Sequence, residues 1–254
     1  MASSWTSPLF KDAYGYDAAW YSTMGRAIVK GLTPYKDLFD LKGPVFFFYE
    51  ALGELIIPGR GGIFLLQLIS MAVTVIFLIK ICRIYISRRL SYLTLILFFW
   101  PYVHLLWGGN TVEELFMPFN MAAIYLGLLY LNKTEEEAAL SYEVKRAGLI
   151  YGIGAAVFAL SKLTVGAPLF AMTLLILIVM IKEKRFISLK NSVIWFFLGV
   201  LIIAVPTFAY FMMRDALSDM IKAVFILGFK RSTDYYISFS SEWERQLLIC
   251  PAAL

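Results

Sequence analysis

The residues best suited to chemistry lie in a polar stretch that precedes a long series of apolar segments. Asp17 stands near the start of this stretch, and Lys42-Gly43-Pro44 ends it. Pro44 suits the first position of a helix, whose positive end favours a phosphate, and Lys42 would supply the countercharge. Gly43 is expected to free the backbone there. An acid and a phosphate-binding lysine in so apolar a chain indicate chemistry at a membrane interface.

Asp17 and Lys42 also have simpler interpretations. Asp17 directly precedes a predicted amphipathic helix, in which Trp20, Met24 and Ile28 recur at about one-turn spacing and which ends at Gly31. Its carboxylate could therefore be a helix N-cap. An interfacial lysine commonly meets lipid headgroups. The spacing alone leaves these alternatives open.

A second polar segment, residues 108–114, carries two further acids. Thr111 and Glu114 match a capping box, which gives Glu114 a structural explanation. Glu113 has no such explanation, so it could share a pocket or a metal with Asp17. Most loop acids of this kind are merely hydrated.

Two other charged residues lie at predicted interfaces. Asp40 stands two residues before Lys42, where an acid is usually solvated. Lys162 falls at a junction between two apolar segments and could meet an anionic headgroup. Snorkelling of its side chain to the interface needs no such partner.

The composition excludes several classes of protein. Of 254 residues, 60% are hydrophobic and 16% are charged, which is outside the soluble globular range and typical of polytopic membrane proteins. The net charge of +5 comes from short basic clusters between apolar runs, so nucleic-acid binding is rejected. Cys82 and Cys250 lack metal-ligand spacing. His104 has no accompanying nucleophile motif, so it is treated as a packed or interfacial histidine.

The apolar runs predict an all-α membrane bundle. Residues 44–57 are too short to cross and contain two glutamates, so a juxtamembrane helix is expected there. The basic segments 80–89 and 182–190 should be cytoplasmic, which places residues 1–62, 108–114 and 214–254 outside. Residues 1–62 would form an external loop with juxtamembrane helices, residues 63–213 the bundle, and residues 214–254 an external tail. The six predicted crossings are residues 63–82, 90–107, 115–132, 147–162, 164–182 and 192–213.

The polar stretch also resembles a known family. Gly15-Tyr16-Asp17 and GLTPYKDLFDLKGP at residues 31–44 look like the first external loop of bacterial GT-C glycosyltransferases, relatives of aminoarabinose transferases and protein O-mannosyltransferases. GNTVEE at 109–114 resembles their second external loop, and SKLT at 161–164 a further signature. The resemblance implies that Asp17 and Glu113 are catalytic. It implies substrate-binding roles for Lys42, Tyr35, Asp40, Asn110, Glu114 and Lys162.

The implied reaction is inverting transfer of a sugar from a polyprenyl-phosphate donor to an extracytoplasmic acceptor. Asp17 would take the acceptor's proton, and Lys42 would stabilise the departing phosphate. The resemblance leaves open whether a divalent metal bridges Asp17 and Glu113. Because family members have further helices, the chain is expected to be a fragment lacking the first helix and the C-terminal part. The alternatives are an inactive remnant and a transporter or flippase component, although the nearly charge-free crossings favour interfacial chemistry.

Overall fold

A computed structural model describes residues 4, 6–9, 15–105, 109–133, 142–228 and 230, without the side chains of residues 101–105, 142 and 143. Every named element within these residues is helical, so the predicted all-α class is confirmed. The elements are α1 (Tyr16–Val29), α2 (Pro44–Ile56), α3 (Arg60–Tyr85), α4 (Arg88–Leu105), α5 (Val112–Leu131), α7 (Tyr142–Ala159), η1 (Leu163–Gly166), α8 (Ala167–Lys182), α9 (Phe186–Met213), α10 (Leu217–Ile221) and η2 (Lys222–Leu227).

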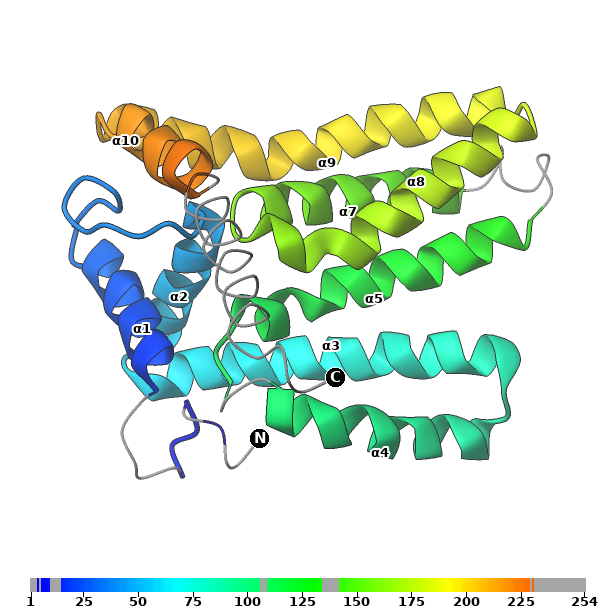
Figure 1. Ribbon diagram of the computed structural model, residues 1–254, viewed down its shortest axis with the longest axis horizontal. Coiled ribbons are helices and arrows are strands. Elements are labelled where there is room, and N and C mark those ends of the chain that lie inside the picture. Colours follow the sequence, from blue (N-terminus) through cyan, green and yellow to red (C-terminus); the bar gives the residue numbers. More distant parts are fainter. Residues whose placement is uncertain are drawn as a thin grey trace, which may run out of the picture.

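Four of these helices are long and apolar enough to cross a membrane: α3, α5, α8 with the preceding η1 turn, and α9. The helices α4 and α7 lie alongside them in the bundle (Figure 1) but are less apolar. Two arginines open α4, and three charged residues lie in the first turns of α7. Four of the six predicted crossings are therefore supported by length and composition, and the other two are not confirmed.

Small residues allow α7 and α9 to pack closely. A side chain at Gly152 would bring its Cβ to 1.9 Å from the carbonyl oxygen of Phe196, and Gly148 faces Ser192 in the same way. Because both residue numbers rise together, the two helices run parallel. Gly148 and Gly152 therefore form a packing surface between the two helices.

The helices α1 and α2 pack together across one end of the bundle (Figure 1), where α2 also meets the start of α3. Phe46 and Phe47 of α2 are fully buried, and Phe46 meets the ring of Tyr21 at 4.8 Å between centroids. Gly25 lets α1 approach the backbone of Glu50 closely. With 13 residues, α2 is not among the described helices that are long and apolar enough to cross a membrane.

The loop between α1 and α2 is held in a defined shape. The predicted end of α1 is confirmed, because Gly31 follows the last turn with a φ of 90°. Tyr35 has a φ of 69° and its N–H donates to the carbonyl of Leu38. Its buried ring lies 5.6 Å from that of Phe211, near the end of α9. The loop therefore leads Lys42 back across the end of the bundle.

Candidate functional site

Asp17 lies in the first turn of α1 with an exposed side chain. The residue at the N-cap is Gly15, so the alternative in which Asp17 caps the helix does not hold. Asp17 instead accepts a hydrogen bond of 3.1 Å from the hydroxyl of Tyr21, one turn further on. The carboxylate is therefore oriented by a side chain and remains open to solvent.

Tyr21 interacts with several of the predicted charged site residues. The Lys42 ammonium lies 4.6 Å from the centroid of its ring, a cation–π contact. Burial raises the pKa of Tyr21, and the carboxylates of Asp17, Asp40 and Glu113 raise it further. These three acids and Lys42 come from α1, the following loop and the start of α5, and they all surround one phenol. We call Asp17, Tyr21, Asp40, Lys42 and Glu113 the Tyr21 cluster.

Asp40 and Tyr35 fix the backbone of Lys42 from two sides. One carboxylate oxygen of Asp40 accepts from the indole N–H of Trp20 at 2.6 Å, and the other accepts from the Lys42 N–H at 2.8 Å. The hydroxyl of Tyr35 donates to the Lys42 carbonyl at 2.5 Å. Asp40 and Tyr35 thus position Lys42, and their polar atoms are already engaged within the protein.

Gly43 is required by a close contact. Its φ of −71° is open to any residue, so it supplies no unusual backbone freedom. A Cβ at Gly43, however, would lie 2.1 Å from the carbonyl carbon and oxygen of Leu160. The N–H groups of Gly43 and Val45 donate to Ser161 and Leu160 at 2.8 and 3.0 Å. The backbone N–H groups of Gly43 and Val45 are thus occupied within the protein. An anion that binds at the start of α2 would be held mainly by the Lys42 side chain.

The same contact brings the α7–η1 junction to the Tyr21 cluster. Lys162, directly after Ser161, forms an ion pair of 2.5 Å with Glu113 at the start of α5. Both side chains are partly exposed. The predicted site residues Asp17, Asp40, Lys42, Glu113 and Lys162 therefore gather at one end of the bundle.

Asn110 and Glu114 belong to a separate, buried network. Thr111 caps α5 by accepting from the Glu114 N–H at 3.3 Å, as the capping-box pattern predicts. The Glu114 carboxylate accepts from Gln67 at 2.6 Å and from the Asn110 N–H at 2.8 Å. Only 1% of Asn110 and 3% of Glu114 is exposed, so the structure places both away from the solvent-facing groups of the Tyr21 cluster.

Glu50 of α2 is also buried. Within the described residues, one of its carboxylate oxygens and both polar side-chain atoms of Asn110 form no hydrogen bond. Burial raises the pKa of Glu50 to about 8, while its interaction with Asn110 opposes that rise. Because α2 lies outside the four candidate crossings, this carboxyl is a buried acid at the rim of the bundle.

Sequence reasoning did not identify Tyr21 or Glu50 as part of a site. Tyr21 follows Asp17 by four residues, which places the two side chains on one face of a helix and was an available signal. Glu50 had no comparable signal, because Asn110 is 60 positions away in the chain. Whether a metal bridges Asp17 and Glu113 stays open, and the described residues contain no group of three or more His, Cys, Asp or Glu side chains that could hold one. The side chain of His104 lies outside them.

A polar cluster at the end of an all-helical bundle with four membrane-crossing candidates defines a membrane-associated helical protein with a solvent-facing site. The family model described as "Putative competence-induced protein Ccs4 N-terminal domain" matches residues 2–239. The chain belongs to this family. Searches of curated proteins and of solved structures found no match.

The family match overturns the resemblance to GT-C glycosyltransferases. The strings that carried this resemblance have local structural causes here. Gly43 allows contact with Leu160, Pro44 begins α2, and Asp40 holds the loop through Trp20. Because each of these residues meets a local structural need, the strings do not identify a family.

Proposed function

We propose that the Tyr21 cluster is the reaction site of a membrane-embedded glycosyltransferase that uses a polyprenyl-phosphate sugar and an extracytoplasmic acceptor. One observation carries this assignment. Asp17 accepts from the hydroxyl of Tyr21, while Lys42 lies against its ring. A carboxylate base and a cation are thus separated by a single aromatic side chain, at the rim of an apolar bundle where a lipid-linked substrate could reach both.

The charges of the cluster suit displacement of a phosphate. The acceptor hydroxyl would form the new bond to the anomeric carbon and pass its proton to Asp17, while the bond from that carbon to the phosphate oxygen breaks. Lys42 forms no ion pair within the described residues, so its charge is available to the departing polyprenyl phosphate. The positive charge of Lys162 is already paired with Glu113, so this lysine would stabilise the departing phosphate less.

We further propose six crossings, with Asp17 outside the cell. The contacts of Gln67 with Glu114 and of Phe77 with Tyr125 indicate that α3 and α5 run parallel. The helix α4, which packs against α3 after a short connection, would then return the chain across the membrane, as α8 does between the parallel helices α7 and α9. The basic residues at the opposite end of the bundle favour a cytoplasmic location for that end.

Release of polyprenyl phosphate tests the proposed reaction. Membranes containing the full chain are incubated with radiolabelled polyprenyl-phosphate glucose and cell-envelope acceptors, and free polyprenyl phosphate is measured. We expect release to fall at least about tenfold in Asp17→Asn and Lys42→Met, because removing one electrostatic contact commonly costs that much in rate. Asp215→Asn and Lys30→Met, exposed changes of the same charge, should retain it.

The same assay distinguishes the alternatives. A transporter or flippase would move the labelled donor across vesicles without releasing polyprenyl phosphate. An inactive remnant would bind the donor without release. Either result, or full turnover by Asp17→Asn, would remove glycosyl transfer from this site. The family description, "competence-induced", says when the protein is produced and names no reaction.

A further inference from the structure

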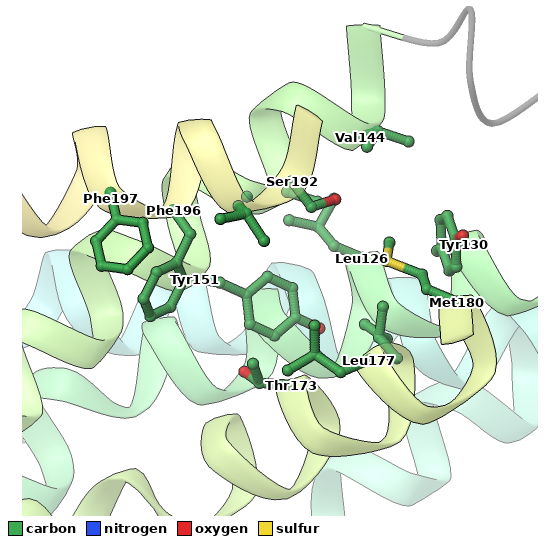
Figure 2. Close-up of a pocket in the computed structure, with 14 residues that line it drawn as sticks. Leu126, Tyr130, Val144, Tyr151, Thr173, Leu177, Met180, Ser192, Phe196 and Phe197 are labelled. Atoms are coloured by element: carbon green, nitrogen blue, oxygen red, sulfur yellow. The ribbon is translucent and has the colours of Figure 1, made fainter. Parts of the chain in front are cut away.

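A second site lies in the opposite half of the bundle, where α5, α7, α8 and α9 enclose a cavity of about 250 Å³ (Figure 2). Most of its wall is made of apolar side chains, and two of the hydroxyls that line it bond to helix backbone. Tyr151 donates to the carbonyl of Ala123 at 2.6 Å, and Thr173 donates to that of Leu169 at 2.8 Å. The cavity offers hydrocarbon contact and little else, so an apolar chain suits it.

A buried arginine stands at one end of this cavity. The guanidinium carbon of Arg185 lies 5.3 Å from the ring centroid of Tyr130, which lines the cavity together with Met180 (Figure 2). The backbone N–H of Arg185 donates to the backbone carbonyl of Met180 at 2.8 Å, which holds the arginine beside the opening. Although only 8% of Arg185 is exposed, it is a cation next to an apolar space.

The donors of this arginine are only partly used. One nitrogen of the guanidinium pairs with Glu183. Within the described residues, its Nη1 has no acceptor at hydrogen-bonding geometry, although the hydroxyl of Tyr130 interacts with the guanidinium. A buried donor left without an acceptor costs free energy, more so when it is charged. The geometry therefore calls for an external acceptor with negative charge.

We propose that this site binds an anionic phospholipid, with an acyl chain in the cavity and the phosphate on Arg185. Two of the cavity's four helices, α8 and α9, join at Arg185 and are both candidate crossings, so the opening lies at the level of lipid headgroups. Lys182 and Lys184 add positive charge around it, which favours an anionic over a zwitterionic lipid. An Arg–phosphate pair is strong because it can be bidentate.

The site does not depend on the proposed reaction. Glu113 and Tyr130 lie at opposite ends of α5, 17 residues apart in the chain. At the rise of an α-helix this corresponds to roughly 25 Å. The lipid site could therefore hold even if the Tyr21 cluster performs no transfer, and the two are tested by different measurements.

Lipid retention tests the site. The full chain is purified in detergent and exchanged with phosphatidylglycerol or with phosphatidylcholine, and retained lipid is measured by native mass spectrometry. We expect preferential retention of phosphatidylglycerol, weakened at least about tenfold by Arg185→Gln. Lys30→Gln, an exposed change of the same charge at the opposite end of the bundle, should leave retention close to wild type. Equal retention of the two lipids, or equal losses in both variants, would overturn the proposal.

A second pair of variants tests the cavity without altering Arg185. Leu177 lines the cavity, whereas Leu174 on the same helix does not line it and is 60% exposed. Leu177→Trp should fill the cavity and reduce retention of phosphatidylglycerol, and Leu174→Trp should not. If inorganic phosphate protects the chain against thermal unfolding as well as phosphatidylglycerol does, the site takes a free anion and the lipid assignment is wrong.

Discussion

Glu50 links protonation to stability at the scale of a single residue. Its carboxyl has a pKa raised from 4.5 to about 8 by burial, and the interaction with Asn110 moderates the rise. The unfolded chain releases this proton near pH 4.5, whereas the folded chain holds it until about pH 8. The folded state therefore binds more protons between these values, and stability falls as the pH rises through this window.

We expect Glu50→Gln to remove most of this pH dependence. The amide keeps the shape of the protonated acid and does not ionise, so the variant should unfold at a higher temperature than wild type at pH 9. The free energy of unfolding of the variant should exceed that of wild type by on the order of a few kcal/mol at pH 9, and by less at pH 5. Thermal unfolding in detergent at both pH values measures it, with Asp215→Asn as the exposed control. An equally steep pH dependence in Glu50→Gln would assign the effect to another group.

The ion pair between Lys162 and Glu113 is partly exposed, unlike the buried carboxyl of Glu50, because 44% of the Lys162 side chain and 38% of the Glu113 side chain are exposed. Solvent screens such a pair, so Lys162→Met should change the free energy of unfolding by less than about 1 kcal/mol. If the Tyr21 cluster is catalytic, the same variant should nevertheless reduce transfer, since Glu113 loses the partner that orients it. Chemical unfolding and polyprenyl phosphate release are measured together. A loss of several kcal/mol would identify the pair as a structural contact instead.

At the scale of elements, Gly43 joins the start of α2 to the end of α7. Its missing side chain allows a backbone approach that a Cβ would block at 2.1 Å. We expect Gly43→Ala to destabilise the protein by about 1–3 kcal/mol or more, because the obstructing atoms are backbone and have little room to move. It should also displace Lys42 and lower transfer.

Gly31 provides the matched control for this prediction. It has a φ of 90°, but nothing lies within 4 Å of the position that a Cβ would occupy. Asn tolerates a positive φ better than most residues, so Gly31→Asn should cost much less than Gly43→Ala. Unfolding in denaturant compares the two. A similar loss in both variants would show that loop flexibility, and not the approach to Leu160, governs this region.

The elements also show which features a sequence can predict. The predicted crossing at residues 63–82 corresponds to Arg60–Tyr85, and that at 192–213 to Phe186–Met213, since apolar run length is a local property. The Thr111 cap was predictable for the same reason, because its partner lies three residues away. The contacts of Tyr21 with Asp40 and Glu113 and those of Glu50 with Asn110 were not predictable, because these neighbours come from distant segments. The family assignment failed because short loop strings have several physical causes.

At the scale of the whole molecule, the Tyr21 cluster and the proposed lipid site lie at opposite ends of the helical bundle. If the proposed crossings are correct, these ends face opposite sides of the membrane. Single cysteines placed at exposed positions would report the sides, in a background where Cys82 and Cys250 are replaced by serine. Lys30 and Asp215 mark the end that carries the Tyr21 cluster, and Ser87 and Lys184 mark the other.

We expect a membrane-impermeant maleimide to label Lys30→Cys and Asp215→Cys in intact cells. Ser87→Cys and Lys184→Cys should react only after permeabilisation, because basic connections are retained in the cytoplasm. Labelling of Ser87→Cys and Lys30→Cys from the same side would mean that α3 does not cross. Labelling of all four from outside would leave the bundle unable to place a donor site and a lipid site in opposite leaflets. Blocking intact cells with a second impermeant maleimide before permeabilisation controls for cell lysis, since positions inside would then keep their full later signal.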